Sequence, residues 1–112
     1  MEKPTVLWFN GGPGCSSLDG WAYEHGPFRI NDTDSTQLYR FDYTWAKLAN
    51  MLYIEAPVGV GFSYSDDPSD YPKCNDDNTA QDNLAGVETF YKLFPEHKQN
   101  DLWITGESYA GV

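Results

Sequence analysis

Gly106-Glu107-Ser108-Tyr109-Ala110-Gly111-Val112 is the most informative stretch of this sequence. Residues 102–105 (Leu-Trp-Ile-Thr) precede it, and such a short apolar, β-prone run predicts a buried strand. A strand that leads into Gly-x-Ser-x-small is typical of a nucleophile elbow, in which a serine sits on a sharp turn. Ala110 stands where the strict pattern has glycine, so the match is approximate. A Gly-Ser turn without catalytic meaning is the alternative interpretation of Ser108.

A second strand and a glycine-rich loop favour the catalytic interpretation. Residues 5–9 (Thr-Val-Leu-Trp-Phe) predict another buried strand, and they lead into Asn10-Gly11-Gly12-Pro13-Gly14-Cys15-Ser16-Ser17. Glycine leaves backbone N–H groups open to a ligand, because no Cβ blocks the approach. In α/β-hydrolases one oxyanion donor comes from such a loop and the other from the residue after the serine. The predicted donors are therefore the N–H groups of Gly12 and Tyr109.

Three blocks together resemble the serine carboxypeptidase family: residues 8–17 (WFNGGPGCSS), residues 54–64 (IEAPVGVGFSY) and residues 106–111 (GESYAG). The resemblance covers almost the whole chain, and the first and last blocks are specific in sequence, order and separation. It implies that residues 1–112 are part of a single α/β-hydrolase catalytic domain. It also implies an activity in which an acyl-enzyme on Ser108 releases C-terminal amino acids from peptides.

A carboxypeptidase must recognise the free terminal carboxylate of its peptide substrate. The resemblance assigns this task to Asn10, the Gly11 amide, Glu24 and Glu107, with Trp8 in support; we call this set the carboxylate clamp. Two glutamates can hold an anion when their carboxyls are protonated and donate hydrogen bonds, and clustering of like charges favours that state. The clamp is therefore expected to work at acid pH. The alternatives are a solvated loop residue for Glu24 and a filler within the turn for Glu107.

The groups that activate the serine are expected outside this chain. A serine hydroxyl needs a base, and hydrolases of this fold carry their residues in the order Ser, Asp or Glu, His. His25 and His97 both precede Ser108, and neither is predicted to be the base. The acid and base are expected beyond Val112, so these 112 residues alone are expected to have no peptidase activity.

Two cysteines and one sequon relate to the compartment. In the resembled family the loop cysteine, here Cys15, is disulfide-bonded to a later cysteine that this chain lacks. A bridge between Cys15 and Cys74 also stays open, because sequence gives no distance. Asn31-Asp32-Thr33 is an N-glycosylation sequon in a secreted protein. The resemblance implies the secretory pathway, with a vacuolar, lysosomal or extracellular destination. Met1-Glu2-Lys3-Pro4 is no signal peptide, so the natural start is expected elsewhere.

Composition excludes several other classes. Seven basic against seventeen acidic residues give a formal charge of -10, which argues against a nucleic-acid partner. No apolar run approaches the length of a membrane span. No cofactor or metal is predicted: Gly59-Val60-Gly61 lacks the third glycine of a dinucleotide loop and is interpreted as a tight turn. An EF-hand starting at Asp66 would place Pro68 at its third ligand position.

The remaining elements complete an α/β pattern. Residues 51–54 predict a third strand, residues 43–48 a helical turn, and residues 32–37 a surface loop. A helix is predicted from a cap at Asn78 and Thr79 to an end at Pro95. Its apolar face comprises Ala80, Leu84, Val87, Tyr91 and Phe94.

These elements predict a parallel sheet of the α/β-hydrolase type, with a crossover helix that packs on it. By analogy with that fold, strand 5–9 lies between strands 51–54 and 102–105. The Gly-rich loop then lies beside Ser108 at the carboxyl ends of the strands, where open α/β sheets bind ligands.

Two other functions fit the same residues. One is acyl transfer on the carboxypeptidase scaffold, which an assay of a blocked dipeptide against an acyl-glucose ester would separate from peptidase activity. The other is a truncated, non-catalytic fragment, which the absence of a later Asp and His favours for the chain alone.

Overall fold

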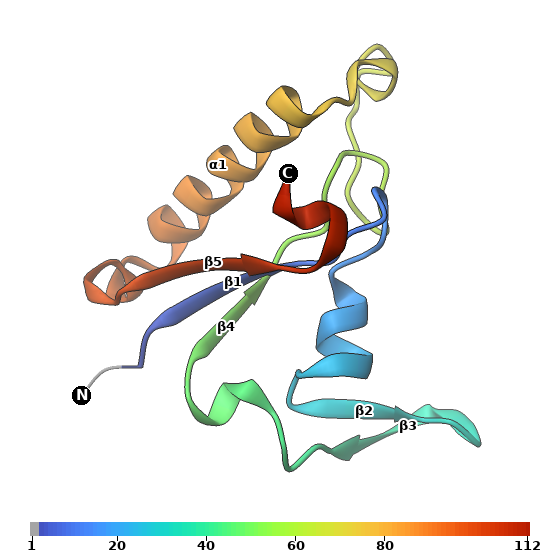
Figure 1. The fold of residues 1–112 in the computed structure, drawn as a ribbon, viewed down its shortest axis with the longest axis vertical. Coiled ribbons are helices and arrows are strands. Elements are labelled where there is room, and N and C mark those ends of the chain that lie inside the picture. Colours follow the sequence, from blue (N-terminus) through green and yellow to red (C-terminus); the bar gives the residue numbers. More distant parts are fainter. Residues whose placement is uncertain (1–2) are drawn as a thin grey trace.

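A three-stranded parallel sheet forms the centre of the computed structural model, which describes residues 3–112 (Figure 1). Strand β1 (Thr5–Phe9) lies between β4 (Asn50–Tyr53) and β5 (Leu102–Gly106). Thr5 pairs with Asn50 on one side and with Leu102 on the other. The predicted strand order is therefore confirmed. Strand β4 begins one residue earlier than predicted, because the Asn50 N–H donates to the Pro4 carbonyl at 2.8 Å and extends the pairing.

The core is small and centres on β1. The buried side chains of this strand are Thr5, Leu7 and Trp8, and Leu7 is only 1% exposed. A strand with partners on both edges and elements over both faces loses most of its contact with water, so the central strand supplies the core. Within residues 3–112, strand β5 has a partner on one edge only, and its Trp103 and Ile104 side chains are exposed.

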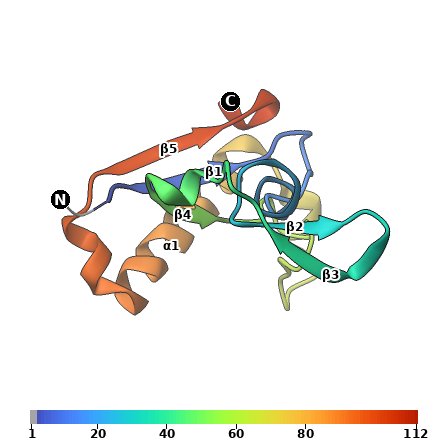
Figure 2. The same cartoon turned by 90° about the horizontal axis from the view of Figure 1, so that it is seen from below.

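Helix α1 (Asp76–Leu93) connects the loop after β4 to β5 and lies along one side of the sheet (Figures 1 and 2). The predicted cap at Asn78 and Thr79 is wrong: the Asn75 side chain caps the helix by accepting the Asn78 N–H at 2.9 Å. Asp76 and Asp77 then fill the first turn, where negative charge complements the helix dipole. The predicted end is confirmed, because a 3₁₀ turn, Pro95–Gln99, follows directly.

The sequence predicts that this helix packs on the sheet, but in the structure the two do not pack closely. A hollow of about 630 Å³ lies between them, and α1 has no fully buried residue. The apolar side chains that line this hollow include Leu7, Ala80, Leu84, Val87, Ile104 and Val112. Ala80, Leu84 and Val87 of the predicted apolar face thus line the space toward the sheet without filling it, whereas Tyr91 and Phe94 do not line it.

The polar segment at 32–37 is not the surface loop that the sequence predicts. Strands β2 (Phe28–Asn31) and β3 (Asp34–Arg40) form an antiparallel hairpin that projects away from the sheet (Figure 2). At the turn, the Asn31 side chain accepts hydrogen bonds from the Thr33 N–H at 2.9 Å and the Thr33 hydroxyl at 2.8 Å. Almost all of β3 is exposed, so no buried face marks this strand in the sequence.

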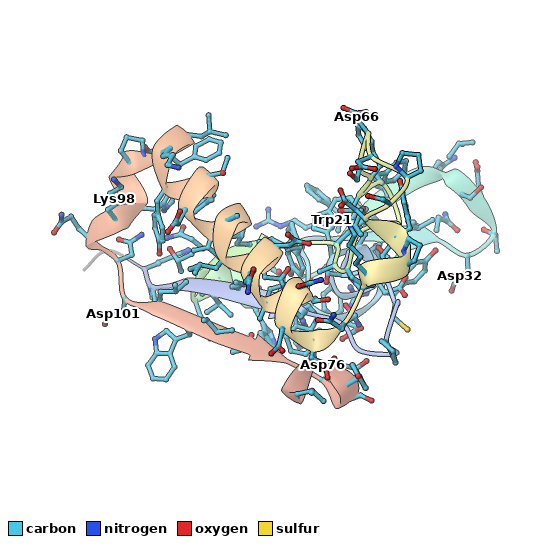
Figure 3. The ribbon with its side chains drawn as sticks, turned by 90° about the horizontal axis from the view of Figure 1, so that it is seen from above. Trp21, Asp32, Asp66, Asp76, Lys98 and Asp101 are labelled. Carbon is cyan, nitrogen blue, oxygen red and sulfur yellow. The ribbon has the colours of Figure 1, made fainter. Side chains whose placement is uncertain are left out.

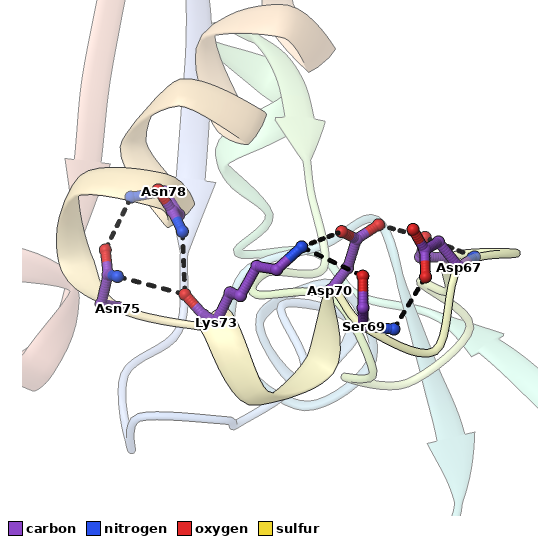
Figure 4. A network of polar contacts seen from close by, with 7 residues as sticks. Asp67, Ser69, Asp70, Lys73, Asn75 and Asn78 are labelled. Atoms are coloured by element: carbon purple, nitrogen blue, oxygen red, sulfur yellow. Dashed lines mark hydrogen bonds and ion pairs between the residues drawn. The ribbon is translucent and has the colours of Figure 1, made fainter.

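Polar contacts order the chain before α1 (Figure 4). The Lys73 ammonium lies 3.5 Å from the Asp70 carboxylate. The backbone carbonyl of Lys73 accepts hydrogen bonds from the side-chain amides of Asn75 and Asn78 at 3.1 and 2.9 Å.

The predicted turn at 43–48 is also present as a 3₁₀ turn, Trp45–Lys47, capped by Thr44. Within the described residues, no helix is both long and apolar enough to span a bilayer.

Loss of the Asn75 cap tests this account of α1. We expect Asn75→Ala to lower the free energy of unfolding by about 1 kcal/mol, because the Asn78 N–H loses its acceptor. The matched control is Gln81→Ala, an exposed position inside the helix, which is expected to change stability by under about 0.5 kcal/mol. Urea unfolding measures both. Equal stabilities for Asn75→Ala and the wild type would contradict the cap.

Candidate active site

Ser108 lies two residues after the end of β5, in a strained backbone conformation. Its φ is +53°, which makes it a non-glycine residue in the left-handed region. Such a conformation costs on the order of 1–3 kcal/mol and is held only where the surroundings fix it. The Glu107 N–H donates to the Phe9 carbonyl at 3.2 Å, and the Ala110 N–H donates to the Glu107 carbonyl at 3.0 Å. These bonds hold a sharp turn with an exposed serine, as in a nucleophile elbow.

The Gly-rich loop touches this turn through Gly11. A Cβ on Gly11 would lie 2.8 Å from both the Glu107 carbonyl oxygen and the Tyr109 nitrogen, and 2.9 Å from the Ser108 Cβ. A Cβ on Gly106 would lie 2.7 Å from the Ala110 Cβ. The parallel order β4–β1–β5 thus brings the segments after β1 and β5 into contact at the carboxyl ends of the strands, as the sequence predicts.

Gly12 and Tyr109, the predicted oxyanion donors, follow Gly11 and Ser108. Gly12 has a φ of +117°, a value that favours glycine. Within residues 3–112, neither N–H donates a hydrogen bond to the protein. The Tyr109 hydroxyl donates to Asp76 in the first turn of α1 at 2.9 Å, and this bond raises the pKa of Tyr109. Figure 3 shows Asp76 at this end of the helix, beside the C-terminal turn.

Asn10 is the centre of a buried hydrogen-bond network. Its side-chain oxygen accepts the Trp8 indole N–H at 2.9 Å and the Gly20 N–H at 3.1 Å. Its side-chain amide donates to the Glu24 carboxylate at 2.6 Å. Because two donors fix the oxygen, the amide must point toward Glu24. Trp8, Asn10 and Glu24, which the resemblance groups in the clamp, therefore lie together.

Glu107, the second predicted clamp glutamate, approaches the loop through its backbone. Its carbonyl oxygen faces Gly11, while the residue as a whole is exposed. Two further residues, which the sequence did not predict, support the clamp. The buried Ser17 hydroxyl accepts the Asn10 N–H at 3.2 Å, and a Cβ on Gly20 would lie 2.6 Å from the Trp8 indole nitrogen. For Ser17, the signal in the sequence was its place as the second of two serines at the end of the Gly-rich loop.

His25 lies in a bend directly after Glu24, and its side chain is buried. Its ring stacks on Trp45 with centroids 4.2 Å apart, meets the edge of Trp8 at 4.4 Å, and shares a hydrogen bond with the Tyr53 hydroxyl at 2.9 Å. Burial lowers the pKa of His25, partly opposed by the neighbouring Glu24 charge. Burial also raises the pKa of Tyr53 to about 12. His25 is thus a buried packing residue next to Trp8 of the clamp.

The other predicted features give no second site. Cys15 and Cys74 are both free and exposed, so the bridge between them that the sequence left open is not formed. Asn31 of the sequon lies at the hairpin turn. His97 pairs with Asn100 at 3.2 Å, so among the described residues neither histidine is hydrogen-bonded to Ser108.

A serine on a sharp turn, set against a Gly-rich loop at the carboxyl ends of a parallel sheet, is the arrangement of a partial α/β-hydrolase fold. The chain belongs to the serine carboxypeptidase family, whose model matches residues 1–112. It is 55% identical over 111 residues to "Lysosomal protective protein" of Mus musculus, covering 99% of this chain and 23% of the mouse protein. It is 50% identical over 111 residues to "Serine carboxypeptidase-like 21" of Arabidopsis thaliana, covering 97% of this chain and 22% of that protein.

The contact at Gly11 gives a steric prediction. A methyl group at Gly11 meets three atoms of the elbow at under 3.0 Å, so Gly11→Ala is expected to destabilise the protein by about 1–3 kcal/mol. Gly111→Ala is the matched control, because a Cβ there meets nothing within 4 Å. Urea unfolding compares the two variants. If both lose the same stability, the close approach of loop and elbow is wrong.

The buried imidazole gives a pH prediction. The folded state binds a proton at His25 less readily than the unfolded state, because burial lowers the pKa. Its contribution to stability is therefore complete above about pH 6.5, the ordinary pKa of histidine, and is lost as the pH falls through the folded-state value. We expect the wild type to lose stability relative to His25→Phe between pH 7.5 and pH 5. A stability difference that is constant with pH, measured by urea unfolding, would contradict this.

Proposed function

We propose that the full-length protein is a serine-type carboxypeptidase that releases C-terminal amino acids through an acyl-enzyme on Ser108. The observation that supports this best is the contact of Gly11 with residues 107–109, because it sets a strained serine beside a loop with open N–H groups. Membership of the family supports the same reaction. The chain spans under a quarter of the relatives named above, so the proposal concerns the whole protein.

In this proposal the Ser108 hydroxyl oxygen attacks the carbonyl carbon of the last peptide bond. The carbonyl oxygen becomes an oxyanion, and the N–H groups of Gly12 and Tyr109 donate to it. The C–N bond then breaks, and the amine leaves with the proton that the serine gave up. Water hydrolyses the resulting ester and restores the hydroxyl. Preorganised donors of this kind are worth about 10²–10³ each in kcat.

A base must take the proton from Ser108. His25 is hydrogen-bonded to Tyr53 and stacked on Trp45, and His97 is hydrogen-bonded to Asn100. We assign the base and the acid that orients it to another part of the full-length protein. By the same reasoning, residues 1–112 alone have no peptidase activity.

The carboxylate clamp accounts for the restriction to chain ends. Asn10, the Gly11 amide, Glu24 and Glu107 are the proposed ligands of the substrate carboxylate, with Trp8 holding Asn10 in place. Asn10 donates to the Glu24 carboxylate at 2.6 Å, so these two proposed ligands already lie side by side.

We extend the proposal to compartment and modification. A relative named as a lysosomal protein supports a secretory route to a lysosome, vacuole or the outside of the cell. On that route Asn31 is a candidate for glycosylation. Cys15 is an exposed free thiol, and it is a candidate for a disulfide with a cysteine outside residues 1–112.

Glu107→Gln in the full-length protein tests the clamp, because glutamine donates a hydrogen bond without needing a proton. We expect the loss of peptidase activity toward neutral pH to be smaller in the variant than in the wild type. An ester substrate without a terminal carboxylate is the matched control and should respond less. Activity of each is measured as kcat/KM from pH 4 to pH 8.

Ser108→Ala is the second arm of this experiment. It should lower kcat on both substrates by about 10⁶. If Ser108→Ala keeps its activity, the acyl-enzyme reaction is wrong. If Glu107→Gln changes peptide and ester hydrolysis equally at every pH, a carboxylate-binding role for Glu107 is wrong.

A further inference from the structure

Glu55 makes a set of contacts that the proposed reaction does not use. It lies two residues after β4, at the same end of the sheet as Ser108. One carboxylate oxygen accepts the Ser16 hydroxyl, and the other accepts the Phe62 N–H at 2.8 Å. The Glu55 carbonyl also accepts the Ser63 hydroxyl at 2.6 Å. The residue therefore joins the Gly-rich loop after β1 to the loop after β4.

The loop after β4 is shaped around this carboxylate. A Cβ on Gly61 would collide with the Glu55 carboxylate, and Gly61 has a φ of +57°. The loop is closed on itself, because the Gly59 N–H donates to the Ser63 carbonyl and the Ser63 N–H donates to the Val60 carbonyl, both at 2.9 Å. Gly61 thus provides the space, and the next residue, Phe62, the N–H donor, that hold Glu55 in one position.

Ser16 is one of two side-chain anchors of the Gly-rich loop. At its start, the Asn10 N–H donates to the buried Ser17 hydroxyl, and the Asn10 side chain is fixed by Trp8. At its end, Ser16 donates to Glu55 and accepts the Leu18 N–H at 3.1 Å. Residues 12–15 between these anchors are all exposed. Within the described residues, this stretch is otherwise held by the Cys15 N–H, which donates to the Gly11 carbonyl at 3.0 Å.

We propose that Glu55 is a positioning residue, which through Ser16 holds the Gly-rich loop so that the Gly12 N–H faces the oxyanion. This inference rests on the proposed function, and it adds a residue that does not itself touch the substrate. A hydrogen bond to a charged acceptor is about twice as strong as a neutral one, which suits it to fix an exposed loop. Donors at an oxyanion hole act only when they are oriented before the reaction, so loop position and kcat are linked.

The expected kinetic signature differs from that of the clamp. Clamp residues act on substrates with a free carboxylate, whereas a displaced Gly12 N–H weakens every transition state that carries an oxyanion. A displacement of about 1 Å at an active site can cost about 100-fold in rate. Glu55→Ala and Ser16→Ala are therefore each expected to lower kcat by roughly 10-fold to 100-fold on both a peptide and an ester, with little change in KM.

The experiment is a double-variant cycle in the full-length protein. Wild type, Ser16→Ala, Glu55→Ala and the double variant are assayed on a blocked dipeptide and on an ester without a carboxylate. The double variant should be no slower than the slower single variant, because both changes break the same contact, the hydrogen bond between Ser16 and Glu55. Glu55→Gln should retain more activity than Glu55→Ala. The glutamine carbonyl oxygen can still accept the Phe62 N–H, and its NH₂ group can donate to the Ser16 hydroxyl. Ser69→Ala, in the polar loop before α1, is the matched control and should match the wild type.

Hydrogen exchange of residues 10–17, followed by mass spectrometry, gives a readout besides activity. We expect Ser16→Ala and Glu55→Gln, both conservative in size, to be folded, and exchange in this segment to be about tenfold faster in Ser16→Ala. Three results would each overturn the role of Glu55. They are additive losses of kcat in the double variant, an increase in KM for the peptide alone, and unchanged hydrogen exchange in residues 10–17. If the wild type has no activity that depends on Ser108, the proposed function fails, and the exchange result alone decides whether Glu55 anchors the loop.

Discussion

The backbone of Gly11 lies so close to the turn at Ser108 that no side chain fits between them. This close approach is possible because β1 is the central strand and β5 pairs with it in parallel, so that both chain segments leave the sheet at the same end. The backbone turn also holds Ser108 at a positive φ. Strand order, glycine at position 11 and the strained serine are therefore parts of one arrangement, and each depends on the others.

Two sets of side-chain contacts surround this arrangement and keep the loop in place. On one side, Trp8, Gly20 and Ser17 fix Asn10, which holds Glu24. On the other, Ser16 binds Glu55 in the loop after β4. The first set includes buried residues and two of the predicted carboxylate ligands, Asn10 and Glu24, whereas the second is polar and lies outside the core. In the proposed enzyme they would have separate tasks, one in substrate binding and one in orienting the oxyanion donor.

The sequence predicted those parts of the fold that carry a strong local signal. Residues 5–9 and 102–105 are short apolar runs, and the analogy with the hydrolase fold, which rests on the glycine and serine patterns after them, placed the loop beside the elbow. Prediction failed where the signal was weak or distant. The hairpin at 28–40 has no buried alternation, so residues 32–37 were interpreted as a loop. The cap at Asn75 was missed because Asn78 and Thr79 offer an equally good local pattern. His25 and Glu55 owe their environments to contacts with residues 28 and 39 positions away, which no local pattern reveals.

The central claim is that the Gly-rich loop and the elbow present two N–H groups to one oxyanion. A crystal structure of the full-length protein with a phosphonate bonded to the Ser108 oxygen tests this most directly, because a phosphonyl oxygen takes the place of the oxyanion. The account predicts one phosphonyl oxygen within about 2.7–3.1 Å of both the Gly12 and the Tyr109 nitrogens. A phosphonate bonded to Ser108 with that oxygen in solvent, or held by other donors, would contradict it.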